Sequence, residues 1–313
     1  MKAVYIDCTE FSAALLTPDL RGLVPELCVH VGDPDPTRLA SLLEGTAGVL
    51  NGHTAMDETM LRAASSVRTI VFLGSSPSSY IDLEAAARQD IRVRTITHYG
   101  DRTIAEHAMA LMLAAARRVA AMDRALRRGI WEPLSGIELA GRTLGVIGTG
   151  GTGQEMIRMA SAFGMRVLAW NRSAAAKDLP SQAVALDALL ADADVVSVHL
   201  ALTPETRGLL GARRLGLMKA GAVLVNTARG GILDEVALIA ALRSGRIAHA
   251  ALDVFATEPL APGHPLAELE NVTLTAHAAF KTPEATGRLL ARGLQLLRQD
   301  LAALAAGEEL PDS

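Results

Sequence analysis

Short apolar runs alternate with amphipathic stretches along the first hundred residues. The runs are rich in Val, Ile and Leu, which favours strands, whereas residues 36–45 and 56–66 carry apolar side chains at helical spacing. Strands separated by helical segments predict βαβ units and hence a largely parallel sheet. The strands expected here lie at residues 2–7, 27–32, 47–52, 68–74 and 91–96.

A second series with the same pattern starts at Arg142. Between the two series we predict one helix over 103–129, unbroken by Pro or Gly until Gly129, and a further helix over 284–307 closes the chain. Small residues dominate the apolar face of the helix at 103–129, which suits either an interdomain strut or a dimer interface. The strands expected in this series lie at residues 143–148, 165–170, 194–200, 222–228, 249–255 and 271–276.

The composition indicates a protein with a large apolar core. A chain of 313 residues is long enough for two domains. Half of the residues are hydrophobic but only 3% are aromatic, so the core is expected to consist of Ala, Leu, Val and Ile, as suits helices packed on a parallel sheet. The net charge of −4, without long runs of one sign, gives no indication of binding to nucleic acid or to an anionic membrane.

The N-terminus and the cysteines bear on localisation. Asp7 interrupts the first apolar run, so this run cannot serve as the hydrophobic region of a signal peptide. No apolar run approaches the roughly 20 residues that a membrane-spanning helix needs. Cys8 and Cys28 fit no metal-binding or CxxC spacing and are expected to be reduced, buried thiols. We therefore expect a cytoplasmic protein.

One predicted strand runs into a glycine-rich loop that opens a helix, and this loop consists of Gly148, Thr149, Gly150, Gly151, Thr152 and Gly153. A GxGxxG motif alone is weak evidence, but strand, loop, helix and strand in succession are the context that dinucleotide binding requires. Gly148 permits the tight turn, Gly150 lets the backbone approach the pyrophosphate, and Gly153 allows close helix–strand packing. The diphosphate would then lie on N–H groups at the helix N-terminus.

The strand after this helix ends without the expected acidic residue. An Asp or Glu there normally accepts a hydrogen bond from the ribose 2′-hydroxyl of NAD, but this chain has Asn171, Arg172 and Ser173. The guanidinium of Arg172 can bind a 2′-phosphate through paired charge-assisted hydrogen bonds, and Ser173 can add a hydroxyl donor. The sequence therefore favours NADP(H). NAD(H) stays open if Asn171 holds the ribose and Arg172 is only solvated.

Three ionisable residues follow predicted strands in the second half: Arg229, Glu258 and His277. Ligands of open α/β sheets bind beyond the carboxyl ends of the strands. Hydride transfer to a 2-keto acid requires an Arg that binds the substrate carboxylate. It also requires a proton donor, here a His whose pKa is kept high by a neighbouring Glu. The other histidines, such as His107 and His199, are expected to be packing residues rather than catalysts. No two histidines are spaced as metal ligands, and Asp234 and Glu235 look like helix N-terminal acids.

Six segments in order resemble the D-isomer-specific 2-hydroxyacid dehydrogenase family, and the resemblance covers nearly the whole chain. These segments are residues 103–113, 141–153, 193–210, 218–247, 250–260 and 271–280. The resemblance implies two doubly wound parallel-sheet α/β domains, a Rossmann-type cofactor domain and a flavodoxin-like substrate domain, with a cleft between them. The substrate domain is expected to be discontinuous, at 1–98 and 283–313, and the cofactor domain to span 99–282. Homodimers that pair through the cofactor domains are also implied, without a C-terminal regulatory extension.

The resemblance also implies roles for single residues. Arg229 matches the substrate-binding arginine, His277 the acid/base histidine, and Glu258 the carboxylate that orients this histidine and raises its pKa. Further matches to cofactor-binding positions are Thr103, His199, Thr206, Thr227 and Asp253.

The chain departs from the family pattern at three places. Ala276 precedes His277 where the family usually has Pro, so the turn lacks one rigid constraint. The substrate loop, usually G-x-G, is Gly74-Ser75-Ser76-Pro77, in which Pro77 has no N–H and the two serines can offer hydroxyl donors. Lys281 stands where the D-lactate dehydrogenase branch commonly has Tyr, and its cation would suit a second anionic group on the substrate.

The leading hypothesis is an NADPH-linked reductase of small 2-keto acids, with glyoxylate- or hydroxypyruvate-like acids as the first substrate guess. The alternatives are an NAD(H)-linked D-lactate- or phosphoglycerate-type dehydrogenase and, from a different class, a dinucleotide-sensing corepressor-like protein. Formate or phosphite dehydrogenases are not favoured by the matching residues.

Overall fold

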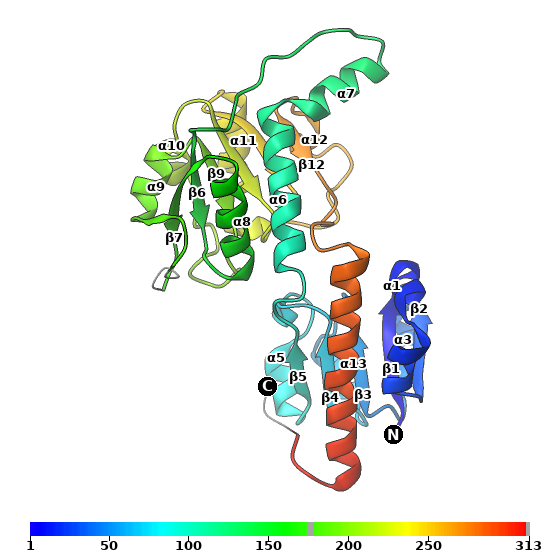
Figure 1. The fold of residues 1–313 in the computed structure, drawn as a ribbon. Helices are drawn as coiled ribbons and strands as arrows, with labels where there is room; N and C mark the ends of the chain where they lie inside the picture. Colours follow the sequence, from blue (N-terminus) through cyan, green and yellow to red (C-terminus); the bar gives the residue numbers. More distant parts are fainter. Residues whose placement is uncertain (174–177, 311–313) are drawn as a thin grey trace. The chain divides into compact units, whose positions relative to one another are not determined.

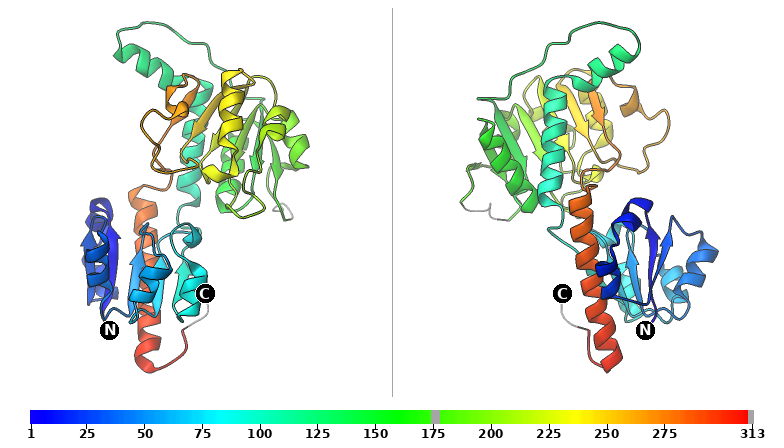
Figure 2. Two further views of the ribbon diagram at one scale, coloured as in Figure 1. Left: turned by 180° about the vertical axis from the view of Figure 1, so that it is seen from behind. Right: turned by 45° about the vertical axis from the view of Figure 1, so that its right-hand side comes forward.

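The structure, a computed structural model, describes residues 1–173 and 178–310. The chain divides into two compact units: unit 1 is Met1–Gly100 with Thr282–Ser313, and unit 2 is Asp101–Lys281. The chain leaves unit 1 after its fifth strand, forms unit 2, and returns to unit 1 as a long C-terminal helix (Figures 1 and 2). The last residues of the expected substrate domain, 311–313, lie outside the described residues.

Unit 1 is built on a five-stranded parallel sheet with the order β2-β1-β3-β4-β5. The order reverses between β1 and β3, which is the switch point of a flavodoxin-like sheet. The strands are β1 (Ala3–Cys8), β2 (Leu27–Val31), β3 (Gly48–Asn51), β4 (Thr69–Phe72) and β5 (Arg92–Thr95).

Helices cover both faces of this sheet. One apolar layer joins α3, α4 and α5 to the sheet, and the other joins α1, α2 and α13 to it through residues such as Leu50, Val71 and Leu294. The helices are α1 (Glu10–Leu15), α2 (Pro18–Leu23), α3 (Pro36–Leu43), α4 (Glu58–Ala63), α5 (Leu83–Arg88) and α13 (Pro283–Ala306), with a 3₁₀ turn at Pro77–Ser79.

A buried ion pair fixes α13 to its sheet. Arg94 of β5 donates to Asp300 Oδ1 at 2.7 Å, and Thr69 Oγ1 donates to Asp300 Oδ2 at 2.6 Å. Asp300 is fully buried, so both of its oxygens need these partners. The contact joins residues more than 200 positions apart and explains how the C-terminal helix belongs to the N-terminal unit.

Unit 2 is built on a seven-stranded parallel sheet with the order β12-β11-β10-β9-β6-β7-β8. Its switch point lies between β6 and β9, as in dinucleotide-binding sheets. Both sheets confirm the predicted fold class. The strands are β6 (Thr143–Ile147), β7 (Arg166–Trp170), β8 (Gln182–Ala183), β9 (Val195–Val198), β10 (Ala222–Asn226), β11 (Ile247–Leu252) and β12 (Val272–Leu274).

Alternate residues of these strands point to two apolar layers. Val146, Val195 and Val225 face α6 and α8, whereas Ile147, Val196 and Leu224 face α9, α10 and α11. The helices of unit 2 are α6 (Asp101–Ala116), α7 (Val119–Arg127), α8 (Gly151–Ala162), α9 (Leu186–Asp192), α10 (Ala212–Leu217), α11 (Glu235–Arg243) and α12 (Pro265–Glu268), with a 3₁₀ turn at Gly230–Ile232.

Two sequence predictions need correction. The helix expected over 103–129 is two helices, α6 and α7. Arg118, between them, adopts a left-handed backbone with φ of +57° and interrupts the helical hydrogen bonding. Figures 1 and 2 show α7 projecting from the body of unit 2, followed by a long connection. Cys8 is buried as expected, but Cys28 is exposed because it lies on the edge strand β2.

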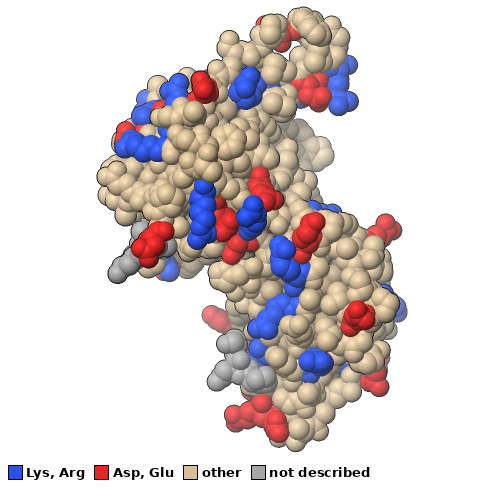
Figure 3. Space-filling view, viewed as in Figure 1, with Lys and Arg blue, Asp and Glu red and all other residues tan. Residues whose placement is uncertain are grey.

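Charged side chains of both signs occur on each unit over the face drawn in Figure 3. Among the described helices, none is both long and apolar enough to cross a bilayer. Within residues 1–173 and 178–310, no three His, Cys, Asp or Glu side chains are grouped so as to hold a metal ion.

Candidate active site

The loop between β6 and α8 lies at the switch point of the unit 2 sheet. Gly148 has a φ of +101°, and a Cβ there would lie 2.4 Å from the His199 carbonyl oxygen at the end of β9. A Cβ on Gly153 would lie 1.9 Å from the Gly148 oxygen, whereas a Cβ on Gly150 would meet nothing within 4 Å. The backbone is therefore packed tightly on one side and accessible at Gly150.

This loop fits a dinucleotide. Gly150 is the N-cap of α8 and, in the part of the chain that the structure describes, no side chain caps the helix there. The hydroxyl of Thr227, at the end of β10, is buried and has no hydrogen-bond partner among the described residues. The N-terminal N–H groups of a helix and a buried hydroxyl without a partner are groups that a polar ligand would satisfy.

The segment after β7 meets this loop and a third one. Asn171 Oδ1 accepts a 3.4 Å hydrogen bond from Thr149 N, and its amide donates to Ser173 Oγ at 3.0 Å. Arg172 does not pair with either neighbour. Its guanidinium lies 3.2 Å from Glu205 Oε2, in the loop that follows β9.

The remaining predicted cofactor residues differ in what their side chains do. Thr206 is buried, and its hydroxyl donates to Ala201 O and accepts from Thr203 N, both at 2.7 Å, so it shapes its own loop. His199 Nε2 lies 2.8 Å from Ser197 Oγ, and burial lowers the pKa of His199 to about 4. Thr103 is buried in the first turn of α6. All of these residues belong to unit 2.

His277 and Glu258 form a short contact at the carboxyl edge of the same sheet. His277 Nδ1 lies 2.6 Å from Glu258 Oε2, and the other carboxylate oxygen accepts from Phe255 N at 2.9 Å. Burial alone would raise the pKa of Glu258, but hydrogen bonds from His277 and Phe255 N and the charges of His277 and Arg229 hold it below its ordinary value. The Glu258 carboxylate is therefore ionised at neutral pH, and Nε2 remains as the imidazole nitrogen able to exchange a proton with a substrate.

Arg229 lies against the loop that carries Glu258. It follows β10, and a Cβ on the adjacent Gly230 would lie 1.9 Å from the Phe255 carbonyl carbon and 2.5 Å from Ala256 N. Only a glycine lets these two backbone segments approach so closely. The Arg229 guanidinium donates to Ala228 O at 2.7 Å, which leaves further N–H groups of its fork for an anion.

The turn that carries His277 is organised by Asp253. This carboxylate is fully buried and accepts from Thr275 Oγ1 at 2.6 Å and from Ala278 N and Ala279 N, each at 2.9 Å. His277 N donates to Asp253 O at 2.8 Å, and His277 has a left-handed φ of +50°. These bonds constrain the turn, which lacks the Pro that the family usually has at the position of Ala276.

Asp253 is tied in turn to α6. His107 Nε2 lies 3.1 Å from Thr275 Oγ1 and 3.5 Å from Asp253 Oδ1. Burial would raise the pKa of Asp253, but the hydrogen bonds from His107, Thr275 and the backbone N–H groups hold it below its ordinary value. The Asp253 carboxylate is thus engaged in shaping the turn.

A second carboxylate holds the Glu258 loop. Asp234 caps α11 through Ala237 N, as its position predicts, but Glu235 accepts from Ala256 N at 3.3 Å and pairs with His264 Nε2 at 3.1 Å. Glu235 therefore positions the segment between Phe255 and His264 as well as lying in the first helical turn.

The predicted substrate-binding residues belong to both units. Gly74, Ser75 and Ser76 follow β4, and Ser76 precedes the 3₁₀ turn Pro77–Ser79. Lys281 is the last residue of unit 2, and its N–H donates to Ala278 O at 2.9 Å.

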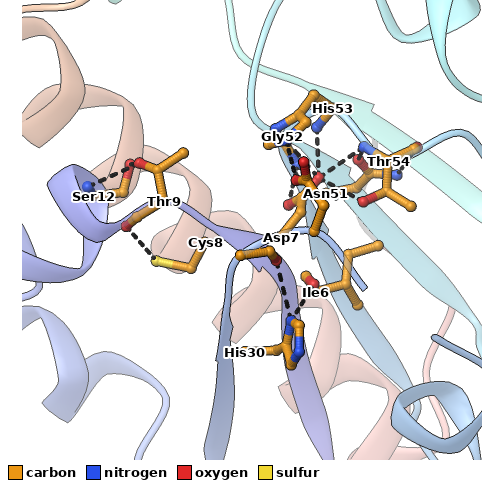
Figure 4. Close-up of polar contacts among 12 residues, drawn as sticks. Ile6, Asp7, Cys8, Thr9, Ser12, His30, Asn51, Gly52, His53 and Thr54 are labelled. Atoms are coloured by element: carbon orange, nitrogen blue, oxygen red, sulfur yellow. Dashed lines mark hydrogen bonds and ion pairs between the residues drawn. The ribbon is translucent and has the colours of Figure 1, made fainter. Parts of the chain in front are cut away.

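The switch point of the unit 1 sheet is filled by the chain itself (Figure 4). The Asp7 carboxylate, at the end of β1, accepts from Gly52 N, His53 N and Thr54 N at 2.8, 2.6 and 2.7 Å, and from Thr54 Oγ1 at 2.9 Å. Three successive N–H groups that would otherwise form an anion site are thereby satisfied. His53 also lies 2.6 Å from Asp33 through Nε2.

The family model described as D-isomer specific 2-hydroxyacid dehydrogenase, NAD binding domain, matches residues 109–279, which include Gly148–Gly153 and the three ionisable strand-end residues. The chain belongs to the D-isomer specific 2-hydroxyacid dehydrogenase family. The resemblance inferred from its motifs is thereby confirmed, and the family model indicates a nicotinamide cofactor.

Relatives in this family carry several names. The D-3-phosphoglycerate dehydrogenase of Mycobacterium leprae (strain TN) is 40% identical over 289 residues, 90% of this chain and 54% of that protein, so the chain spans about half of its length. The glyoxylate reductase of Aeropyrum pernix is 43% identical over 244 residues, 74% of this chain and 72% of that protein. The crystal structure of the TT0316 protein from Thermus thermophilus superimposes with a TM-score of 0.85 at 36% identity, covering 100% of this chain and 99% of that chain.

Several residues that shape the site were missed by sequence reasoning. Glu205 was overlooked because an acid was sought only after β7, although the strand order places β7 and β9 on the two sides of β6. Asp101, which accepts from Thr152 Oγ1 at 3.2 Å beside Gly151, lies in a segment without a motif. The bonds that His107 and His264 form to carboxylates have no signal in the sequence either.

Proposed function

We propose that the chain is a nicotinamide-dependent reductase of small 2-keto acids, with NADPH preferred and glyoxylate- or hydroxypyruvate-like acids as substrates. The observation that carries the proposal is the 2.6 Å contact of His277 with Glu258 beside Arg229, at the sheet edge that also holds the Gly148–Gly153 loop. These groups offer a carboxylate clamp and a proton donor next to a dinucleotide site.

In this mechanism, the Gly148–Gly153 loop of unit 2 would hold a nicotinamide cofactor, which would supply a hydride for C2 of the acid. Arg229 holds the substrate carboxylate in its planar fork and polarises the 2-oxo group. His277 gives the proton on Nε2 to the oxygen at C2, while Glu258 keeps the ring oriented through its contact with Nδ1. In the opposite direction, His277 accepts this proton. Glu235 and Asp253 act on these groups only by positioning their loops.

The proposed residue roles extend to both units. Unit 2 is the dinucleotide-binding unit, with Gly148–Gly153 at the pyrophosphate and Asn171, Arg172 and Ser173 at the adenosine ribose. In unit 1, the serines at 75 and 76, after Gly74, are proposed to bind substrate. Lys281, the last residue of unit 2, is proposed to bind it as well. Ser75 is exposed and Ser76 partly exposed, so their hydroxyls can replace the backbone donor that Pro77 lacks, which supports this assignment.

The test of this proposal is an assay with NADPH, NADH and a panel of 2-keto acids, followed at the nicotinamide absorbance band. We include 3-phosphoglycerate with NAD⁺, because relatives named D-3-phosphoglycerate dehydrogenase match 90% of the chain. Oxidation of NADPH with glyoxylate or hydroxypyruvate is the expected result. Binding of a dinucleotide without turnover of any acid would instead favour a sensor of the corepressor type.

The NADPH preference depends on Arg172. In Arg172→Asp, a carboxylate replaces the cation that would bind the 2′-phosphate, so we expect KM for NADPH to rise by about 10- to 100-fold and KM for NADH to change far less. Steady-state kinetics with both dinucleotides measure this split. An unchanged preference would remove Arg172 from the cofactor site.

A homodimer formed through unit 2 is also proposed. The α7 helix and the segment after it expose large apolar side chains, with exposed fractions of 53% for Leu126, 46% for Ile130 and 87% for Trp131. Apolar side chains gathered on a projecting element are typical of a subunit interface. Light scattering that gave only the monomer mass would contradict this part of the proposal.

A further inference from the structure

An ion pair joins two loops at the proposed adenosine end of the cofactor site. Arg172, after β7, lies 3.2 Å from Glu205 Oε2, after β9, and both side chains are exposed, at 60% and 63%. The two loops come from strands on either side of β6, whose own loop is Gly148–Gly153. The cation expected to bind a 2′-phosphate therefore already has an anionic partner.

The position of Glu205 is fixed by its own loop. Thr203 Oγ1 donates to Glu205 Oε2 at 2.7 Å, and the Thr206 hydroxyl accepts from Thr203 N at 2.7 Å and donates to Ala201 O at 2.7 Å. The hydrogen bond from Thr203, a bond from its own backbone and the charge of Arg172 hold the pKa of Glu205 below its ordinary value. An ionised carboxylate is thus held in front of the guanidinium at neutral pH.

We infer that Glu205 is a specificity-determining residue that limits the preference for NADPH by competing with the 2′-phosphate for Arg172. The inference rests on the proposed function only in requiring that a dinucleotide binds at the β6–α8 loop. A 2′-phosphate must displace the carboxylate from Arg172 and then lies near a like charge, whereas a 2′-hydroxyl keeps the ion pair and gains an acceptor. Glu205, in the loop after β9, thus takes the place of the acidic residue that usually follows β7 and accepts a hydrogen bond from the ribose 2′-hydroxyl.

The test measures nucleotide binding rather than turnover. Dissociation constants of adenosine 2′,5′-bisphosphate and of 5′-ADP are determined by calorimetry on the full chain, for the unmodified protein, Glu205→Gln and Arg172→Gln. Glu205→Gln is expected to tighten the bisphosphate by about 3- to 10-fold, the range for removing one exposed like charge and its competing pair, and to leave 5′-ADP within about twofold. Arg172→Gln is expected to weaken the bisphosphate selectively.

A matched control separates this effect from net charge. Glu270 is another exposed glutamate paired with an arginine of unit 2, Arg124, at 3.4 Å, and Glu270→Gln changes the charge by the same amount. This control should leave both nucleotides unaffected. The effect of Glu205→Gln should also shrink as salt rises, because exposed charges are screened.

The outcomes distinguish this inference from the proposed function. Equal tightening of both nucleotides, no change, or the same effect from Glu270→Gln would overturn the role of Glu205, even if 2-keto acids are reduced. Selective tightening in a protein that reduces no acid would support Glu205 and count against the reductase. If neither nucleotide binds to any variant, both are wrong.

Discussion

At the switch point of the unit 2 sheet, between β6 and β9, the loop Gly148–Gly153 presents a helix N-terminus without a side-chain cap among the described residues. At the switch point of the unit 1 sheet, between β1 and β3, three successive N–H groups point to the Asp7 carboxylate. Both sheets follow the same winding rule, under which the switch point is the place where a ligand is expected to bind. The two edges differ in what their carboxylates bind: Asp7 accepts from the backbone N–H groups of the unit 1 loop, whereas Asp101, beside Gly151 in unit 2, accepts from the Thr152 hydroxyl.

The two edges also each hold a histidine beside a carboxylate. The Nδ1 of His277 lies 2.6 Å from Glu258, and the Nε2 of His53 lies 2.6 Å from Asp33. Asp33 is 79% exposed, whereas Glu258 is 30% exposed and is further held by Phe255 N. The two pairs have the same distance but differ in constraint, because His277 and Glu258 are both half-buried and Glu258 is also fixed by Phe255 N, which suits the unit 2 pair better to proton transfer.

The largest expected effect is the loss of turnover on replacing His277, compared with replacing His53. His277→Ala should lower kcat by about 10²- to 10⁴-fold, because general acid catalysis contributes that much, while His53→Ala should retain most of its turnover. The measurement is reduction of the best 2-keto acid found in the panel assay, with thermal unfolding to verify that both variants are folded. Comparable losses in the two variants would show that the edge of unit 1 takes part in the reaction and would remove the proposed contrast.

A smaller effect, on the free energy of unfolding, is expected on removing the Asp7 carboxylate from the unit 1 sheet edge. Asp7→Ala leaves three N–H groups and the Thr54 hydroxyl without their acceptor and should lower the free energy of unfolding by about 3 kcal/mol, measured by urea denaturation. Asp7→Asn, which keeps one carbonyl oxygen, should lose less. Added formate should stabilise Asp7→Ala more than the unmodified protein, because the vacated N–H groups can bind an anion. A variant as stable as the parent would show that Asp7 does not hold this loop.

A third effect concerns the loss of stability of unit 2 on acidification. Burial, with the nearby charges of Arg118 and Arg124, lowers the pKa of His249 in β11 to about 4. The unfolded chain, with an ordinary pKa near 6.5, binds more protons between these values, so stability is present above about pH 6.5 and falls on acidification by up to about 1.4 kcal/mol per pH unit. His249→Gln should flatten this slope.

The readout can be confined to unit 2, because both tryptophans of the chain, Trp131 and Trp170, belong to it. Urea unfolding followed by tryptophan emission at several pH values gives the slope. An identical slope in His249→Gln would assign the acid sensitivity to other groups, of which His199 is the first to test, since burial lowers its pKa to about 4 as well.

The strands were largely predictable from the sequence, because runs such as AVLVN over β10 are short, β-branched and bounded by polar residues. The two-residue strand β8 was missed because it is too short to form a pattern. The break at Arg118 was missed for another reason: a left-handed residue that is not Gly or Asn carries no local signal, and tertiary packing sets its conformation.

Within the site, motif and position predicted that Arg229, Glu258 and His277 would follow strands at one sheet edge, and the structure brings Glu258 and His277 into contact. The residues that hold them could not be predicted. Glu235 bonds to Ala256 N, and Asp253 to Ala278 N and Ala279 N, and such bonds to backbone depend on loop conformation rather than on residue type. The sequence was therefore more informative about which ionisable groups lie at this sheet edge than about which groups hold them in place.

The absence of a side chain at Gly230 has a consequence for how the site tolerates change. Its backbone lies directly on the peptide between Phe255 and Ala256, so a displacement of the strand end that bears Arg229 pushes the loop of Glu258 in the same direction. Displacements of Arg229 and of the Glu258 loop are therefore expected to be correlated. We therefore expect substitutions elsewhere in the unit 2 sheet to move Arg229 and Glu258 together rather than apart.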